Sequence, residues 1–251
     1  MALLKLKKTQ FAYDETPVVK DFDLVINERQ IISIMGPSGC GKSTVLRLIA
    51  GLEKPTSGTC LFDGKPLEKP SPELRYCFQD YDAFPWKVVR KNLLLAGATE
   101  EKSEITFNID DLLGKIGLAE HYKKYPAELS GGMRKRLALG RCLAAKPKLI
   151  LLDEPFSSLD VDARCEMYTL LQTLWSEWHC VFVIVTHDIH EAILLSQRIL
   201  ISEPLPFRTK ALIDIPFKYP RHESISTTEE YLSIAHRVRE LLQPVRNTKK
   251  S

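Results

Sequence analysis

The 251-residue sequence contains no long apolar run. A membrane-spanning helix needs about 18 consecutive apolar residues. The longest runs here, Leu149 to Leu152 and Cys180 to Val185, have the length of buried strands. The chain's first residues contain too short an apolar part for a secretory signal. These absences predict a soluble chain in the cytoplasm that does not cross a membrane by itself.

The sequence also lacks a strong excess of charge of one sign. It has 35 Lys and Arg against 32 Asp and Glu, which gives a formal net charge of +3. This excess is small and scattered, whereas a nucleic-acid-binding surface is a concentrated basic patch. We therefore expect no nucleic-acid partner.

Cysteine is present but not paired in sequence. The six cysteines are far apart and form no C-x-x-C pair; they are Cys40, Cys60, Cys77, Cys142, Cys165 and Cys180. This spacing argues against a zinc or disulfide framework and favours reduced thiols in a cytosolic chain.

A glycine-rich run from Gly36 to Thr44 matches the phosphate-loop pattern G-x-x-x-x-G-K-[ST]. It follows the apolar run Ile31 to Met35 and opens into a predicted helix from Lys42 to Ala50, which is the context that the pattern requires. Backbone N–H groups of such a loop surround phosphate, Lys42 reaches the β- and γ-phosphates, and the Ser43 hydroxyl holds Mg²⁺. The residues predicted to bind nucleotide here are Gly36, Pro37, Ser38, Gly39, Cys40, Gly41, Lys42, Ser43 and Thr44.

The remaining pattern predicts an α/β fold with a helical insert. Strands are expected at residues 3–7, 18–26, 30–35, 59–62 and 74–78, and apolar runs at 149–152 and 181–185 predict parallel strands buried on both faces. Residues 86–145 have helical periodicity, as do a long amphipathic segment through Met167 to Trp178 and a final helix at 227–242. Residues 205–221 are expected to add a strand or two and a loop.

Two carboxylates follow the first of these buried runs. Asp153 ends the strand near the phosphate loop, where it can orient Mg²⁺, and Glu154 can polarise a water for attack on the γ-phosphate. A solvated pair at a strand end is the alternative, but pairing with the phosphate loop favours catalysis. The group Ser130-Gly131-Gly132 before a predicted helix is a second candidate anion site, although alone it could be a plain helix start.

The chain resembles an ATP-binding-cassette (ABC) ATPase over about residues 3 to 205. The resemblance rests on five motifs in order: the phosphate loop, Ser130-Gly131-Gly132, Asp153-Glu154-Pro155, Ser158-Leu159-Asp160 and Thr186-His187-Asp188. It implies a P-loop NTPase fold that binds ATP and Mg²⁺, with an N-terminal antiparallel β subdomain, a RecA-like parallel-sheet core and an α-helical insert. The implied division of the single domain, residues 1–251, is a core with the β subdomain at 1–85 and 146–205, a helical subdomain at about 86–145 and a C-terminal extension at 206–251.

The resemblance also assigns residue roles. Gln79 is implied to sense the γ-phosphate and Mg²⁺, and His187 to contact the γ-phosphate. Tyr13 is implied to stack on adenine, with packing on the core as the alternative. Two cassettes, identical or homologous, would enclose two nucleotides head to tail, so that Ser130, Gly131 and Gly132 complete the other chain's site and Asp160 crosses the interface.

The segment Phe84-Pro85-Trp86 resembles cassettes that serve importers of nitrate, sulfonate, taurine and thiamine precursors. In that group the surface from Gln79 to Trp86 receives a short helix of a membrane permease, and an extracytoplasmic solute-binding protein takes part indirectly. The resemblance implies a peripheral protein on the cytoplasmic face of the cell membrane. Capping of the helical insert by both aromatics is the alternative interpretation.

Three points stay open at this stage. Arg29 stands where the family usually has glycine, so the geometry of its turn is left open. Met133 stands where many members of the family have glutamine. Cys40 in the phosphate loop is either a reactive thiol whose alkylation blocks hydrolysis or a small buried residue. The alternative functions are an ATPase of an unfused exporter or of a DNA- or ribosome-directed process.

Overall fold

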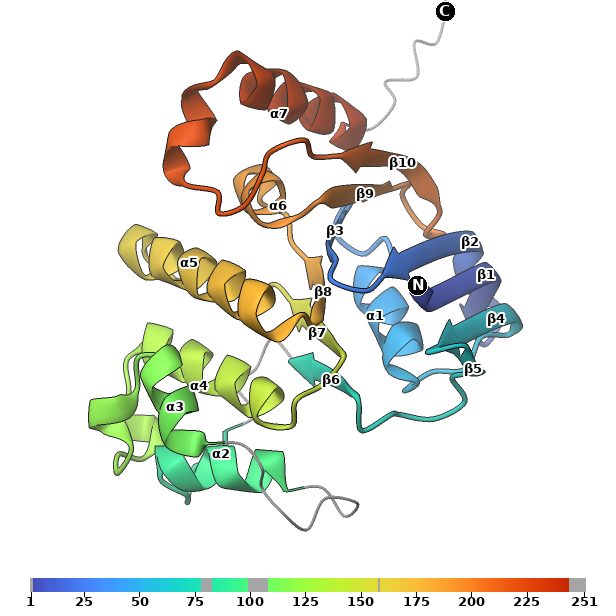
Figure 1. Ribbon diagram of the computed structural model, residues 1–251. Helices are drawn as coiled ribbons and strands as arrows, with labels where there is room; N and C mark the ends of the chain where they lie inside the picture. Colours follow the sequence, from blue (N-terminus) through green and yellow to red (C-terminus); the bar gives the residue numbers. More distant parts are fainter. Residues whose placement is uncertain (1, 78–82, 99–107, 158, 244–251) are drawn as a thin grey trace, which may run out of the picture.

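The computed structural model describes residues 2–77, 83–98, 108–157 and 159–243 (Figure 1). The first strands form a four-stranded antiparallel sheet in the order β2-β1-β4-β5. Its members are β1 (Ala2–Tyr13), β2 (Thr16–Asn27), β4 (Ser57–Phe62) and β5 (Lys65–Pro66). Side chains along β2 alternate in its second half between buried and exposed, as expected for a sheet with one face on the core.

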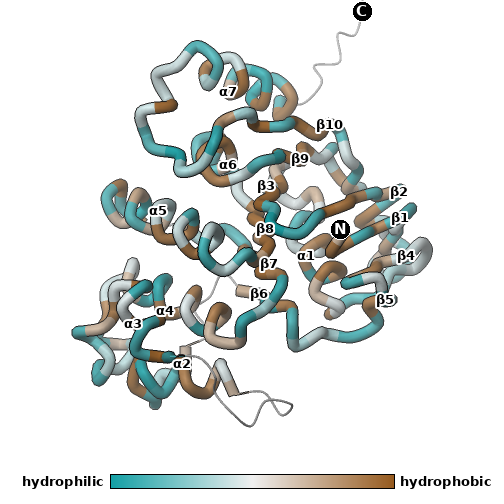
Figure 2. Tube along the Cα trace, in the orientation of Figure 1, coloured by the Kyte–Doolittle hydropathy of each residue, from teal (hydrophilic) through white to brown (hydrophobic). Residues whose placement is uncertain are grey.

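A second sheet of six strands forms the centre of the molecule, in the order β10-β9-β3-β8-β7-β6. Its strands are β3 (Ile31–Met35), β6 (Leu74–Cys77), β7 (Leu149–Asp153), β8 (Val181–Val185), β9 (Arg198–Ser202) and β10 (Thr209–Asp214). Neighbours from β9 to β6 are parallel, and β10 pairs antiparallel with β9. Every residue of β3 and β8 is buried, and these strands are the brown centre of Figure 2.

Three helices each follow a parallel strand: α1 (Lys42–Ala50) follows β3, α5 (Val161–Trp178) follows β7 and α6 (Ile189–Leu195) follows β8. Because parallel strands end at the same edge, the segments after β3, β7 and β8 converge there. Those segments carry the phosphate loop, Glu154 and His187. The described part of the chain contains no helix that is both long and apolar enough to cross a membrane.

The helical part of the chain contains α2 (Val89–Gly97), α3 (Ile109–Lys115) and α4 (Gly131–Ala144). Short 3₁₀ turns at Ala119–His121 and Pro126–Glu128 lie between α3 and α4. The three helices lie together at one end of the molecule, well away from α1 (Figure 1). Buried apolar side chains hold them together; these include Leu93, Leu112, Ile116, Leu137 and Leu143. An antiparallel sheet, a mostly parallel sheet and a helical group agree with the predicted fold.

The end of the described chain folds back over α6. After β10, a 3₁₀ turn (Glu223–Thr227) leads into α7 (Glu229–Leu242), whose buried side chains are Tyr231 and Val238. The buried guanidinium of Arg221 donates to the carbonyl oxygens of Ile193 at 2.6 Å and Ser196 at 2.7 Å. The last residues of α6 are therefore bonded to the segment that precedes α7.

Candidate active site

The phosphate loop links the end of β3 to the start of α1. Gly41 is the N-cap of α1 with φ 105°, and no side chain caps the first turn. A Cβ at this position would lie 3.1 Å from Val18 Cγ1 and 3.2 Å from the Val18 carbonyl oxygen. Both the positive φ and this close approach therefore favour glycine here. The first amides of α1 lack a side-chain acceptor and are available to an anionic ligand, which the helix dipole also favours.

Lys42 folds over its own loop. Its Nζ donates to the carbonyl oxygens of Gly36 and Pro37, each at 2.9 Å. The ammonium group thus lies at the mouth of the loop, where it can exchange these carbonyl acceptors for phosphate oxygens. Ser43, the next residue, is exposed at the same helix start.

Cys40 is buried beneath the loop. Its side chain is 1 % exposed, and its Sγ lies 3.1 Å from Ser202 Oγ on β9. Of the two interpretations from the sequence, this position favours the small buried residue. A reagent would have to displace the loop to reach the thiol.

Asp153 at the end of β7 is held by a neighbouring strand. The hydroxyl of Tyr76 on β6 donates to Asp153 Oδ2 at 3.0 Å. Burial raises the pKa of Tyr76, and the nearby Asp153 raises it further, so the phenol stays protonated and acts as the donor. No sequence pattern predicts this role, because a tyrosine in a strand is most often a core residue.

Glu154 and His187 face each other at the ends of β7 and β8. Glu154 Oε1 lies 3.6 Å from His187 Nδ1. Glu154 has φ 46°, a left-handed conformation that is rare for a residue with a side chain, while its N–H still donates to the Val185 carbonyl at 2.9 Å. Both side chains open onto a cavity of about 270 Å³. The geometry therefore places a carboxylate and an imidazole beside one cavity.

Hydrogen bonds on both sides fix the segment that carries His187. The buried Thr186 hydroxyl accepts from the Asp188 N–H at 3.0 Å and donates to Glu191. Asp188 caps α6 by accepting from the N–H groups of His190 and Glu191. Burial raises the pKa of Glu191. The imidazole itself is exposed between these anchors, so a ligand can reach it.

Ser130 caps α4 by accepting from the Met133 N–H at 3.2 Å. A Cβ at Gly131 would meet no atom within 4 Å, so this glycine faces open space. Figure 1 shows α4 and α1 well apart in the same chain. The structure therefore does not bring Ser130, Gly131 and Gly132 to the chain's own phosphate loop.

One turn into α4, Lys135 is buried, and its Nζ donates to the carbonyl oxygen of Ser157. Burial lowers the pKa of this lysine. Ser157 lies in the segment that leads from Glu154 to Asp160. The helix that Ser130 caps is thus bonded to the segment that follows Asp153 and Glu154, which the sequence motifs did not predict.

Three more predicted residues have different outcomes. Asp160 is exposed and caps α5 by accepting from the Ala163 N–H at 2.8 Å. Tyr13 is 41 % exposed on the β1–β2 hairpin, with its hydroxyl 3.3 Å from Glu53 Oε1, so its ring is accessible to a ligand. Gln79 lies outside the described residues.

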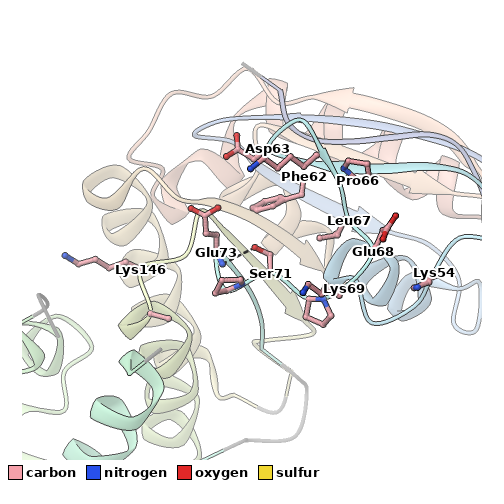
Figure 3. A pocket seen from close by; sticks show the side chains of 14 residues that line it. Lys54, Phe62, Asp63, Pro66, Leu67, Glu68, Lys69, Ser71, Glu73 and Lys146 are labelled. Carbon is pink, nitrogen blue, oxygen red and sulfur yellow. Dashed lines mark hydrogen bonds between the residues drawn. The ribbon is translucent and has the colours of Figure 1, made fainter. Parts of the chain in front are cut away.

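A larger cavity lies elsewhere in the described structure. It has a volume of about 680 Å³ and lies by the amino ends of β6 and β7, beyond the last turn of α1 (Figure 3). Lysines and carboxylates line it, including Lys54, Lys65, Asp63 and Glu73. Two of these carboxylates are paired with Lys148. This larger cavity therefore lies at the opposite end of the parallel strands from Glu154 and His187.

Comparison with known proteins identifies the family. A family model described as ABC transporter matches residues 19–157, which is more than half of the chain. The chain belongs to the ABC transporter family. As an ABC cassette it binds ATP. The phosphate loop and the two carboxylates at the end of β7 lie within the matched residues.

Several characterised relatives are similar over most of the cassette. An aliphatic sulfonates import ATP-binding protein, SsuB 3 of Pseudomonas syringae pv. syringae, is 40 % identical over 216 residues, which cover 86 % of this chain and 77 % of the relative. The nitrate import ATP-binding protein NrtD of Synechococcus elongatus is 37 % identical and covers 81 % of this chain and 76 % of the relative. Among solved structures, a dimeric post-hydrolysis state of the ATP-binding cassette MJ0796 bound to ADP and Pi matches with a TM-score of 0.70 at 29 % identity, covering 86 % of this chain and all of that one.

Proposed function

We propose that this cassette is the ATP-hydrolysing subunit of an importer for a small solute. The observation that carries the proposal is the 3.6 Å approach of Glu154 Oε1 to His187 Nδ1 at the carboxyl ends of two adjacent parallel strands. The relatives named as sulfonate and nitrate import proteins support the direction of transport. A sulfonate or nitrate is accordingly the solute class to test first, whereas an exporter or a DNA- or ribosome-directed role has no support among them.

The residues of one chain divide the hydrolysis chemistry. Glu154 polarises a water for in-line attack on the γ-phosphate, and His187 donates a hydrogen bond to the γ-phosphate from the opposite side. Lys42 and the open amides at the start of α1 neutralise the charge of the phosphates. Gln79 senses the γ-phosphate, and the exposed ring of Tyr13 stacks on the adenine.

Mg²⁺ fits the donors that the site offers. The Ser43 hydroxyl and the Asp153 carboxylate are hard oxygen ligands, and Tyr76 orients the carboxylate. No group of three or more His, Cys, Asp or Glu residues within the described part of the chain is arranged to hold a metal. Mg²⁺ is commonly held by one or two protein groups, phosphate oxygens and waters. When bound, the ion would neutralise phosphate charge.

A second cassette completes the site. The helix that follows Ser130, α4, lies apart from α1 in the same chain (Figure 1), and Gly131 has open space in front of it. We infer that residues 130–132 contact the γ-phosphate held by the partner chain and that Asp160 crosses the interface. The matching cassette structure is itself a dimer. Because two chains share each nucleotide, ATP stabilises the closed pair and hydrolysis releases it.

The permease would bind beside the helical part of the chain. Trp86 is 68 % exposed, and a cavity of about 200 Å³ nearby is lined by residues of β6, α2 and α4. An exposed aromatic side chain beside a groove suits the binding of a short permease helix. The cassette would then be peripheral on the cytoplasmic face, with a solute-binding protein acting indirectly through the permease. The predicted division into a core, a helical subdomain at about 86–145 and a C-terminal extension is part of this proposal.

The proposed hydrolysis is tested by replacing Glu154. We expect Glu154→Gln to lower Mg-ATP hydrolysis by at least about 10²-fold, since general-base catalysis contributes about 10² to 10⁴. ATP binding should be retained, and a dimer should accumulate with ATP in size-exclusion chromatography. Glu120→Gln, an exposed position in the helical part, is the matched control. Full activity of Glu154→Gln would reject the assignment.

The import role needs a second test. Uptake of a labelled sulfonate and of labelled nitrate is compared in cells with the wild-type chain and with Glu154→Gln. Uptake of one of them that depends on Glu154 supports import. Efflux of a solute, with no uptake of either, would contradict it while leaving the ATPase assignment unaffected.

A further inference from the structure

The loop from Phe84 to Val88, which leads into α2, is closed by one buried side chain. Asn92 is 0 % exposed and lies in the first turn of α2. Its Oδ1 accepts from the Phe84 N–H at 2.7 Å. Its Nδ2 lies within donor distance of three carbonyl oxygens, those of Phe84 at 3.1 Å, Lys87 at 2.8 Å and Val88 at 3.3 Å.

This arrangement is not a helix cap, because the first N–H groups of α2, those of Val89 and Arg90, donate to the carbonyl oxygens of Lys124 and Tyr122. Val88 is the N-cap of α2 and supplies no side-chain cap. The amide of Asn92 instead reaches back and binds the loop from within the helix. Only a side chain with both a donor and an acceptor can satisfy the Phe84 N–H together with the carbonyl groups. Since unpaired buried polar groups are costly, loss of this amide would release the loop.

The loop presents two aromatic rings in different settings. Phe84 is half-buried, and the guanidinium carbon of Arg141 on α4 lies 4.6 Å from its ring centroid. The Trp86 ring lies 5.7 Å from the Phe84 ring at an interplanar angle of 44° and is 68 % exposed. An exposed indole therefore rests on a platform fixed by Asn92 and Arg141.

A fixed indole is suited to bind a partner tightly. Ordering a side chain and its loop at an interface costs about 0.5–1.5 kcal/mol for each immobilised side chain, and preorganisation removes that cost. Large aromatic side chains are also frequent energetic centres of interfaces. The basic residues Lys87 and Lys91 both follow Trp86 in sequence, so a complementary partner surface has an apolar socket with acidic neighbours.

We propose that Asn92 is the positioning residue of the permease-docking surface. It holds the loop so that Trp86 is presented, preformed, to an apolar socket on a short cytoplasmic helix of the permease. This inference rests on the proposed function, because it takes the permease as the partner. Asn92 does not touch nucleotide, so hydrolysis by the cassette alone does not depend on it.

The test compares Asn92→Ala with Trp86→Ala and with Asn108→Ala. Asn108 caps α3 by accepting from the Asp110 and Asp111 N–H groups, so its loss weakens the same helical part without touching the loop. Each full-length variant is titrated onto inverted membrane vesicles stripped of their own cassettes with urea, with wild-type protein as competitor. Basal hydrolysis, melting temperature and amide hydrogen exchange of residues 84–88 are measured in parallel.

Asn92→Ala is expected to weaken saturable vesicle binding about tenfold or more and to speed exchange at Phe84, with basal hydrolysis unchanged. Trp86→Ala should weaken binding without faster exchange, and Asn108→Ala should lower the melting temperature while binding normally. If Asn92→Ala does not fold, Asn92→Asp replaces it; this variant keeps the acceptor for Phe84 but loses both donors, and an intermediate loss of binding is expected.

Two outcomes would overturn the inference in different ways. Normal binding by Asn92→Ala together with weak binding by Trp86→Ala would remove the role of Asn92 and leave the docking surface in place. Normal binding by both variants would show that the permease does not dock at Trp86, which rejects that part of the proposed function as well. Hydrolysis activity of the Glu154→Gln and wild-type proteins is independent of both outcomes.

Discussion

The Tyr76 hydroxyl donates to Asp153 Oδ2 across the boundary between β6 and β7, at 3.0 Å. The two strands are parallel neighbours, with Tyr76 paired in register to Leu151, so the phenol reaches the carboxylate at the strand end. A carboxylate fixed in this way has one oxygen occupied by a neutral donor and one directed elsewhere. Tyr76 therefore orients the group that we propose to act on Mg²⁺ and its waters.

Removal of this hydroxyl should weaken the response to Mg²⁺. Hydrogen bonds to charged groups contribute about 1.5–3 kcal/mol, and Tyr76→Phe deletes this one while keeping the buried ring. We expect the half-saturating Mg²⁺ concentration for hydrolysis to rise about 3- to 10-fold, with a nearly unchanged rate at saturating Mg²⁺. Tyr122→Phe, at an exposed ring, should leave the Mg²⁺ titration unchanged. An equal fall in rate at all Mg²⁺ concentrations would contradict the positioning role.

The bond from Lys135 to the Ser157 carbonyl should matter for hydrolysis but not for binding of ATP to one chain. Lys135→Met keeps most of the buried stem and removes the donor. Because Ser157 precedes the segment with Asp160, the interface with the second cassette should be misplaced, and we expect about tenfold slower hydrolysis. Fluorescent-nucleotide binding to the monomer should be unchanged. Lys218→Met, at an exposed position, is the control, and unaltered hydrolysis by Lys135→Met would refute the link.

Arg29 should be replaceable with a gain in stability. It has φ 55°, in the left-handed region where residues with a Cβ are disfavoured by about 1–2 kcal/mol. Arg29→Gly relieves this strain but makes the unfolded chain more flexible, which costs about 0.4–1 kcal/mol. We expect a net gain of about 0.5 kcal/mol in the free energy of unfolding, measured by urea denaturation. Arg29→Ala retains a Cβ and should give no gain; an equal gain from both variants would point to the arginine side chain instead.

The buried Glu191 should make stability depend on pH. Its pKa is raised above the ordinary value of 4.5 by burial, so the folded chain binds this proton more tightly than the unfolded chain. The stabilising contribution is complete below about pH 4.5 and is lost as pH rises through the folded-state pKa. We therefore expect the free energy of unfolding of Glu191→Gln to increase relative to that of the wild type as pH rises from about 5 to 8. A difference that stays constant with pH would show that Glu191 does not titrate in this window.

Local patterns predicted the elements that lie on either side of the site. The helix at 42–50 has the predicted bounds, and β7 and β8 match the predicted buried runs closely. These elements are determined by short-range signals: a glycine-rich turn before a helix, or a continuous run of β-branched and apolar residues. The geometry of the turn at Arg29 was left open, and the structure places this residue in the left-handed region that suits the glycine usual in the family.

Other features depend on contacts between distant segments, which no local pattern contains. The final helix was predicted from apolar spacing that included Leu232, yet Leu232 is 56 % exposed and Tyr231 occupies the buried position against α6. The roles of Tyr76 and Asn92 depend on which backbone and carboxylate groups lie beside them in space. The role of Gln79 stays a prediction, as do those of Ser130, Gly131, Gly132 and Asp160, whose partners would belong to a second chain.

Helix α4 has one end at Ser130 and carries Arg141 eleven residues later, against the ring of Phe84. At 1.5 Å rise per residue these points are about 16 Å apart along a continuous helix. A tilt of about 5° about one end would move the other by about 1.4 Å over this length. If the second cassette binds at Ser130 and the permease at Trp86, as we propose, this helix is a lever arm that couples displacements at the two contacts.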